Sequence, residues 1–159
     1  MEISLSTPVN PVFDAWVSAD LDEMLAVVHI TDCRPVDRHY LLTGVVKAAF
    51  SSRHKDPKYR HMAVLYCQQY LEEWPRLWQP LLENIAIGDP GEKNHLSPEG
   101  TLPYVPVFPY YAKLLVEGGL YPEAIALIKE AGEYPFSEYM RSEMVYVLDS
   151  IQSHLKKAG

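Results

Sequence analysis

A cluster of basic residues in the segment SSRHKDPKYRH has the clearest potential for binding chemistry in this sequence. Its candidate binding side chains are Arg53, His54, Lys55, Lys58 and Arg60. Pro57 suits the first position of a helix, where its missing N–H costs no hydrogen bond. The free N–H groups at a helix N-terminus favour an anion, as do the surrounding cations. The cluster is therefore a candidate site for a carboxylate or phosphate of a partner.

The uneven distribution of charge along the chain offers the same cluster an internal partner. Residues 1–33 carry six acidic residues and no Lys or Arg, whereas residues 34–62 carry seven bases and two acids. An ion-pair network between the cluster and the acidic N-terminal segment is the alternative, and we expect it in preference to partner binding. The net charge of −7 at pH 7 argues against general nucleic-acid binding.

Tyrosine is the second candidate for binding. The chain has eleven tyrosines, and three of them, Tyr104, Tyr110 and Tyr111, lie in or beside a proline-rich stretch. Tyrosine combines a large contact area with a hydroxyl and loses little conformational entropy, which is why binding surfaces use it. The alternative is that most of the tyrosines lie at the edges of the core with their hydroxyls in water, as we expect for Tyr66, Tyr70 and Tyr146.

Catalytic and metal-binding patterns are weak. The sequence contains no nucleotide-binding loop and none of the common protease motifs. His29 and Cys33 are four residues apart, but no second pair of ligands has a matching spacing, so we expect neither metal nor cofactor. A small helical enzyme would have to use Glu72, Glu73, His54 or His61. The two glutamates are adjacent, so on a helix they point in different directions and form no natural acid–base pair.

Helical periodicity dominates the chain and predicts an all-α fold in a single domain, residues 1–159, with about six or seven helices. Asp20 is a predicted N-cap, and Pro75 and Pro80 are expected to bracket a turn. Residues 88–107 form a Pro/Gly-rich loop, extended in its second half. The expected helices cover residues 11–17, 21–28, 36–51, 57–74, 108–117 and 122–133, and a last one follows Ser137.

Composition indicates an ordinary globular protein, with 48% hydrophobic and 22% charged residues. No apolar run approaches the roughly 18 residues that a membrane span needs. The N-terminal segment has an early acid and no Lys or Arg, which does not fit a secretory signal. Cys33 and Cys67 are too few for a disulfide scaffold. We therefore expect a cytoplasmic location.

Small residues recur where two of the expected helices would cross. Ala112 lies before the Gly118–Gly119 turn, and Ala124 and Ala131 follow it, so two antiparallel helices could approach closely there. This pattern resembles a tetratricopeptide repeat, a helical hairpin of 34 residues. The matching positions in residues 108–136 are Phe108, Ala112, Leu115, Ala124, Ile128 and Ala131. Pro135 comes one residue before the family's proline position. Residues 41–75 look like a degenerate second copy, with Ala63, Cys67, Tyr70 and Pro75 at matching spacing.

The resemblance implies a non-catalytic helical module that binds a protein or peptide. One alternative is an acidic inhibitor of the immunity or antitoxin type, which would cover a basic partner protein; size and net charge allow it. The other is the small helical enzyme described above.

Overall fold

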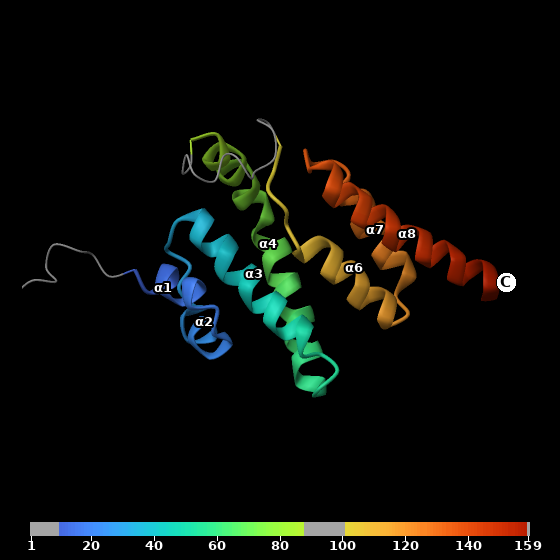
Figure 1. The fold of residues 1–159 in the computed structure, drawn as a ribbon, viewed down its shortest axis with the longest axis horizontal. Helices are drawn as coiled ribbons and strands as arrows, with labels where there is room; N and C mark the ends of the chain where they lie inside the picture. Colours follow the sequence, from blue (N-terminus) through green and yellow to red (C-terminus); the bar gives the residue numbers. More distant parts are fainter. Residues whose placement is uncertain (1–9, 88–100, 159) are drawn as a thin grey trace, which may run out of the picture.

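The computed structural model describes residues 10–87 and 101–158, and this part of the chain is all-helical (Figure 1). The expected all-α class is confirmed. The described helices are α1 (Pro11–Ser18), α2 (Leu21–Val27), α3 (Pro35–Ser51), α4 (Pro57–Ile87), α6 (Val107–Glu117), α7 (Tyr121–Ala131) and α8 (Glu138–Ala158). None of these helices has the length and apolar character that crossing a membrane requires.

The α3–α4 hairpin lies in the middle of the molecule. Helices α1 and α2 pack on one side of α3, and α6, α7 and α8 follow on the other side of the hairpin (Figure 1). Side chains from α3, α4, α6, α7 and α8 form one large apolar core. A second, small core lies between α1, α2 and α3, and its buried members are Val12, Ala15, Met24, Leu41 and Val45. Helix α3 therefore contributes to both cores.

Side-chain caps begin the first two helices, and the cap at Asp20 is the one that the sequence predicts. The side chain of Asn10 accepts from the Phe13 N–H at 3.0 Å and caps α1, and that of Asp20 accepts from the Glu23 N–H at 3.0 Å and caps α2. Helix α2 lies so close to α3 that a Cβ atom on Gly44 would be 2.6 Å from Met24 Sδ. A side chain at residue 44 would therefore require the end of the Met24 side chain to move.

The turn expected between Pro75 and Pro80 is wrong, because α4 runs through both prolines. Each proline lacks the N–H that would bond the carbonyl four residues earlier, which costs about 3 kcal/mol inside a helix. Trp74, Leu77 and Leu81 are buried in the large core from this same stretch, and their burial offsets that cost. Figure 1 shows that the axis of α4 changes direction toward its C-terminal end.

The Pro/Gly-rich loop expected at residues 88–107 is described only from residue 101, since residues 88–100 lie outside the described part. Residues 101–105 have no helical structure, and α6 already begins at Val107. The Leu102 N–H donates to the Pro135 carbonyl at 2.8 Å, and Leu102 and Val105 are fully buried. The second half of this loop is therefore packed into the core.

The alanines singled out in the last third of the chain are core residues. Ala112, Ala124 and Ala131 are all buried, and α6 packs against α7. Gly119 ends the turn between them with a φ of 77°, a conformation that glycine adopts without strain. Small buried residues suit any close pair of antiparallel helices, so the resemblance to a tetratricopeptide repeat stays a prediction.

We expect the replacement Ala124→Leu to overpack the α6–α7 contact and lower the free energy of unfolding by about 1–3 kcal/mol. The matched control is Ala126→Leu in the same helix, because Ala126 is exposed. Urea denaturation followed by circular dichroism measures both variants. If both variants lose the same free energy of unfolding, the packing of α6 against α7 does not require a small side chain at residue 124.

Candidate functional site

The two arginines of the basic cluster bind a residue far along the chain. Arg53 Nη2 lies 2.9 Å from Glu117 Oε2, and Arg60 Nη1 lies 2.7 Å from Glu117 Oε1. Arg60 also donates to the Leu114 carbonyl at 2.6 Å. The hydrogen bonds from Arg53 are the main reason why the pKa of Glu117 is lowered. These contacts attach the C-terminal end of α6 to the turn between α3 and α4.

The expected clamp on the acidic N-terminal segment is wrong for the described residues, because Glu117 of α6 takes that place. No described ion pair joins residues 10–33 to the basic cluster. The acidic side chains of that segment are exposed instead: Asp14, Asp20, Asp22, Glu23 and Asp32. Residues 1–9 lie outside the described part. The basic cluster does form internal ion pairs, as predicted, but among the described residues its partner is Glu117 and not the acidic N-terminal segment.

The anion site expected at the start of α4 is already occupied by an acidic side chain. Asp56 Oδ1 accepts from the Lys58 N–H at 2.9 Å, so a carboxylate of the chain satisfies one of the free donors there. His54, Lys55 and Lys58 are exposed around it, and within the described residues neither lysine forms an ion pair. Since Arg53 and Arg60 are paired with Glu117, the remaining residues His54, Lys55 and Lys58 form an exposed basic surface and not an anion pocket.

Two of the three tyrosines predicted to bind a partner lie together, and the third lies elsewhere. The Tyr104 hydroxyl donates to Glu143 Oε1 of α8, and burial is the main cause of the raised pKa of Tyr104. The Tyr110 ring stacks on Phe50, with 4.3 Å between centroids. Lys113 Nζ lies 5.9 Å from the Tyr110 centroid and 3.9 Å from Glu143 Oε2, which connects the two tyrosines.

Tyr111 contacts α4 instead, where its hydroxyl accepts from Gln68 Nε2 at 3.2 Å. It therefore does not join the other two tyrosines. We define the tyrosine surface by Tyr104, Tyr110 and two residues of α8 that follow.

Helix α8 adds two tyrosines that sequence reasoning did not single out as binding residues. Tyr139 is 68% exposed and Tyr146 is 74% exposed. They are seven residues apart, so they lie on one side of α8. The Tyr139 ring meets the Tyr104 ring edge to face at 5.5 Å. Tyr146 was expected at the edge of the core, but most of its side chain is exposed to solvent. These residues complete the tyrosine surface: Tyr104, Tyr110, Tyr139 and Tyr146.

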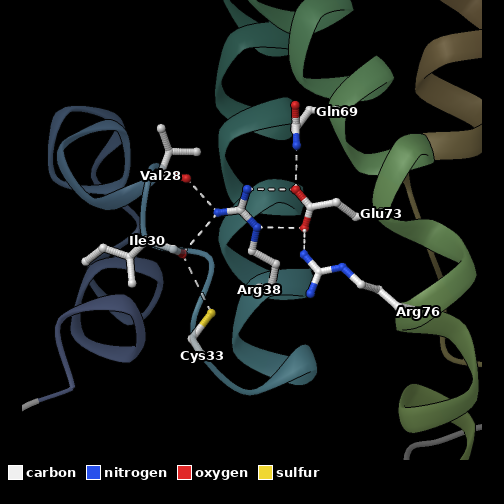
Figure 2. Close-up of polar contacts among 7 residues, drawn as sticks. All are labelled: Val28, Ile30, Cys33, Arg38, Gln69, Glu73 and Arg76. Atoms are coloured by element: carbon white, nitrogen blue, oxygen red, sulfur yellow. Dashed lines mark hydrogen bonds and ion pairs between the residues drawn. The ribbon is translucent and has the colours of Figure 1, made fainter.

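A buried ion pair joins the first turn of α3 to the middle of α4 (Figure 2). Arg38 Nε and Nη2 each donate to one carboxylate oxygen of Glu73 at 2.8 Å. The two side chains are only 3% and 7% exposed. Arg38 Nη1 donates to the carbonyl of Val28 at 2.6 Å and to that of Ile30 at 3.3 Å. The pair thus joins both helices of the hairpin to the segment that follows α2.

The carboxylate of Glu73 is fully engaged. Gln69 Nε2 donates to it at 2.6 Å and Arg76 Nη2 at 2.9 Å, in addition to Arg38. Burial alone would raise the pKa of Glu73, but the hydrogen bonds and the two positive charges outweigh burial and lower the pKa. Its neighbour Glu72 is exposed, as expected for adjacent residues on a helix. Arg38 falls at helical spacing with the core residues Leu41, Leu42 and Val45, which was the signal for its burial.

The other residues proposed for an enzyme do not gather around Glu73. His54 and His61 are exposed. His29 is exposed too, and the Cys33 thiol lies 3.8 Å from the Ile30 carbonyl. The described part of the chain contains no group of three or more His, Cys, Asp or Glu side chains that could hold a metal ion. Within the described residues, therefore, the proposed acid–base residues form no pair.

A buried histidine escaped the sequence reasoning. His39 Nδ1 lies 2.7 Å from the hydroxyl of Tyr70, and both residues are buried in the α3–α4 hairpin. The expectation that Tyr70 lies at the edge of the core with its hydroxyl in water is therefore wrong. Burial lowers the pKa of His39 to about 4, because the core solvates the imidazolium ion poorly. The imidazole is therefore neutral at pH 7, and its proton uptake is coupled to unfolding.

The chain matches no protein-family model, and comparison with curated proteins and with solved structures gave no match.

We expect the buried His39 to make stability depend on pH. The pKa is lower in the folded chain than the ordinary 6.5. The unfolded chain therefore takes up the proton first, and stability falls as pH drops from 6.5 toward 4. Between pH 7 and pH 5 the free energy of unfolding should fall by about 2 kcal/mol. Urea denaturation at a series of pH values measures this.

In the variant His39→Phe this dependence should flatten. The matched control Tyr70→Phe removes the bonded hydroxyl but leaves the buried imidazole, so it should keep the pH dependence. If the stability of His39→Phe depends on pH as steeply as that of the wild type, the pH dependence does not come from His39.

Proposed function

We propose that the protein is a non-catalytic binding module whose tyrosine surface receives a segment of a partner protein. The observation that carries this proposal is the exposure of Tyr139 and Tyr146 beside the fixed rings of Tyr104 and Tyr110. Two aromatic side chains that are about 70% exposed have little of their apolar surface buried in the free protein, and a partner can cover that surface. Tyrosines are among the residues that dominate binding energy in protein interfaces.

The rigidity of the surface supports the same function. Tyr104 is bonded to Glu143, and Tyr110 is stacked on Phe50, so these rings lose little freedom when a partner binds. Lys113 and Glu143 lie between the rings and offer charged groups for orienting a polar backbone. An apolar platform with a few placed polar groups is typical of an interface centre.

An acidic inhibitor is a second candidate, favoured by the charge on α1 and α2. All five acidic residues between residues 10 and 33 are exposed, and this segment has no Lys or Arg. Such a surface would attract a basic partner and speed its association, an effect that salt weakens. This surface lies on the opposite side of the α3–α4 hairpin from α8 (Figure 1).

One binding experiment separates the two functions. The partner is captured from source cells, identified and purified, and its affinity is then measured for three variants. The double variant Tyr139→Ser/Tyr146→Ser should weaken binding by about 2 kcal/mol or more, roughly 30-fold, with an unchanged melting temperature. The control Val17→Ser/Leu65→Ser removes apolar groups that are 54% and 53% exposed elsewhere, and it should bind normally.

The third variant, Asp22→Asn/Glu23→Gln, tests the acidic inhibitor. Three results together would favour the inhibitor: this variant associates more slowly, the association rate of the wild type falls steeply with salt, and the tyrosine variant binds normally. The tyrosine surface would then not be the binding site.

A further inference from the structure

A groove lies between the α1–α2 pair and the outer side of α3, away from the tyrosine surface. Its volume is about 380 Å³, within the range of small-molecule sites. Its walls are mainly apolar, and the lining residues used below are Trp16, Met24, Tyr40, Thr43, Lys47 and Ser51. Nothing in the proposed protein-binding function uses this groove.

One end of the groove is a fixed aromatic wall. The rings of Trp16 and Tyr40 stack with 4.6 Å between their centroids. The indole Nε1–H of Trp16 donates to Asp37 Oδ1 at 3.0 Å, and Asp37 is itself held by an ion pair with Arg34 at 2.8 Å. The indole therefore cannot rotate freely. A flat apolar ligand can pack against this wall without paying to order it.

Two polar side chains in the lining of the groove, those of Lys47 and Thr43, have no hydrogen-bond or ion-pair partner among the described residues. Lys47 is the one charged residue in the described lining, and no described carboxylate pairs with it. Thr43 is only 7% exposed, and its hydroxyl is buried without a hydrogen-bond partner. Because this oxygen has almost no accessible surface, a ligand in the groove does not reach it. Ser51 lies one helical turn beyond Lys47 and offers a further donor.

The Lys47 cation and the exposed Ser51 hydroxyl call for an acceptor group with negative charge. Asp20 and Glu23 are exposed and adjacent in sequence to lining residues, so they oppose a highly charged ligand. Salt screens this repulsion beyond about 8–10 Å, and the repulsion acts about twice as strongly on a phosphate dianion as on a ligand with a single negative charge. We propose that this groove binds a small aromatic carboxylate, with its ring against Trp16 and Tyr40 and its carboxylate toward Lys47 and Ser51.

The test is a titration of the full chain with naphthoate, followed by nuclear magnetic resonance of the tryptophan indole N–H groups. The neutral control ligand is the corresponding naphthyl alcohol. Naphthoate should shift the Trp16 signal in a saturable way and leave the Trp74 and Trp78 signals in place. The alcohol should bind at least severalfold more weakly. No saturable shift of the Trp16 signal, or equal binding of both ligands, would overturn the proposal.

Four variants locate the ligand, and a melting curve checks that each is folded. Lys47→Gln should weaken naphthoate binding about threefold to fivefold, and Lys47→Arg should retain it. Ala48→Leu, which fills the groove, should abolish it. Thr43→Val is the control: it should change neither binding nor the unfolding midpoint, since it removes a buried hydroxyl that has no hydrogen-bond partner and does not reach the groove. Unchanged naphthoate binding in Ala48→Leu or in Lys47→Gln would show that the ligand does not bind in this groove.

Discussion

The buried ion pair between Arg38 and Glu73 is the contact on which the arrangement of the helices depends. It joins α3 to α4, and through the carbonyls of Val28 and Ile30 it holds the end of α2 as well. Two charges taken out of water are stable only when every donor and acceptor is matched, and here Gln69 and Arg76 complete the set. The small core of five buried residues has little apolar area, so these charge-assisted bonds matter most for α1 and α2.

The same hairpin separates two surfaces of different chemistry. On one side, α1 and α2 present exposed acids and, with α3, the groove that contains Lys47. On the other side, α6 and α8 present the tyrosine surface, and the pairing of Arg53 and Arg60 with Glu117 attaches α6 to the hairpin. The positions of both surfaces therefore follow from the packing of α3 and α4. The tyrosine surface leaves Tyr139 and Tyr146 largely exposed, and the groove contains the charge of Lys47, which has no ion-pair partner among the described residues.

The helices and their faces could be predicted because periodicity and capping are local. Asp20 caps α2, Pro57 begins α4, and Ala112 and Ala124 are buried as expected. The contacts between distant residues could not be predicted. Glu117 lies 64 residues from Arg53, and nothing near either residue selects that partner over the acids at the N-terminus. The continuity of α4 through its prolines likewise depends on packing, which no local pattern reveals. The exposure of Tyr139 and Tyr146 could not be predicted, because it depends on how α8 lies against α6.

A double-mutant cycle on Arg38 and Glu73 tests most directly whether this pair holds the helices together. Glu73→Leu alone leaves a buried guanidinium without its carboxylate and should cost about 3–5 kcal/mol of unfolding free energy. Arg38→Met alone should be similarly costly, whereas the double variant should lose far less than the sum, because neither charge is then left buried and alone. Arg76→Gln is the control: Arg76 is 56% exposed in its side chain, so its loss should change stability by no more than about 1 kcal/mol. Losses that simply add in the double variant would contradict the central role of the pair.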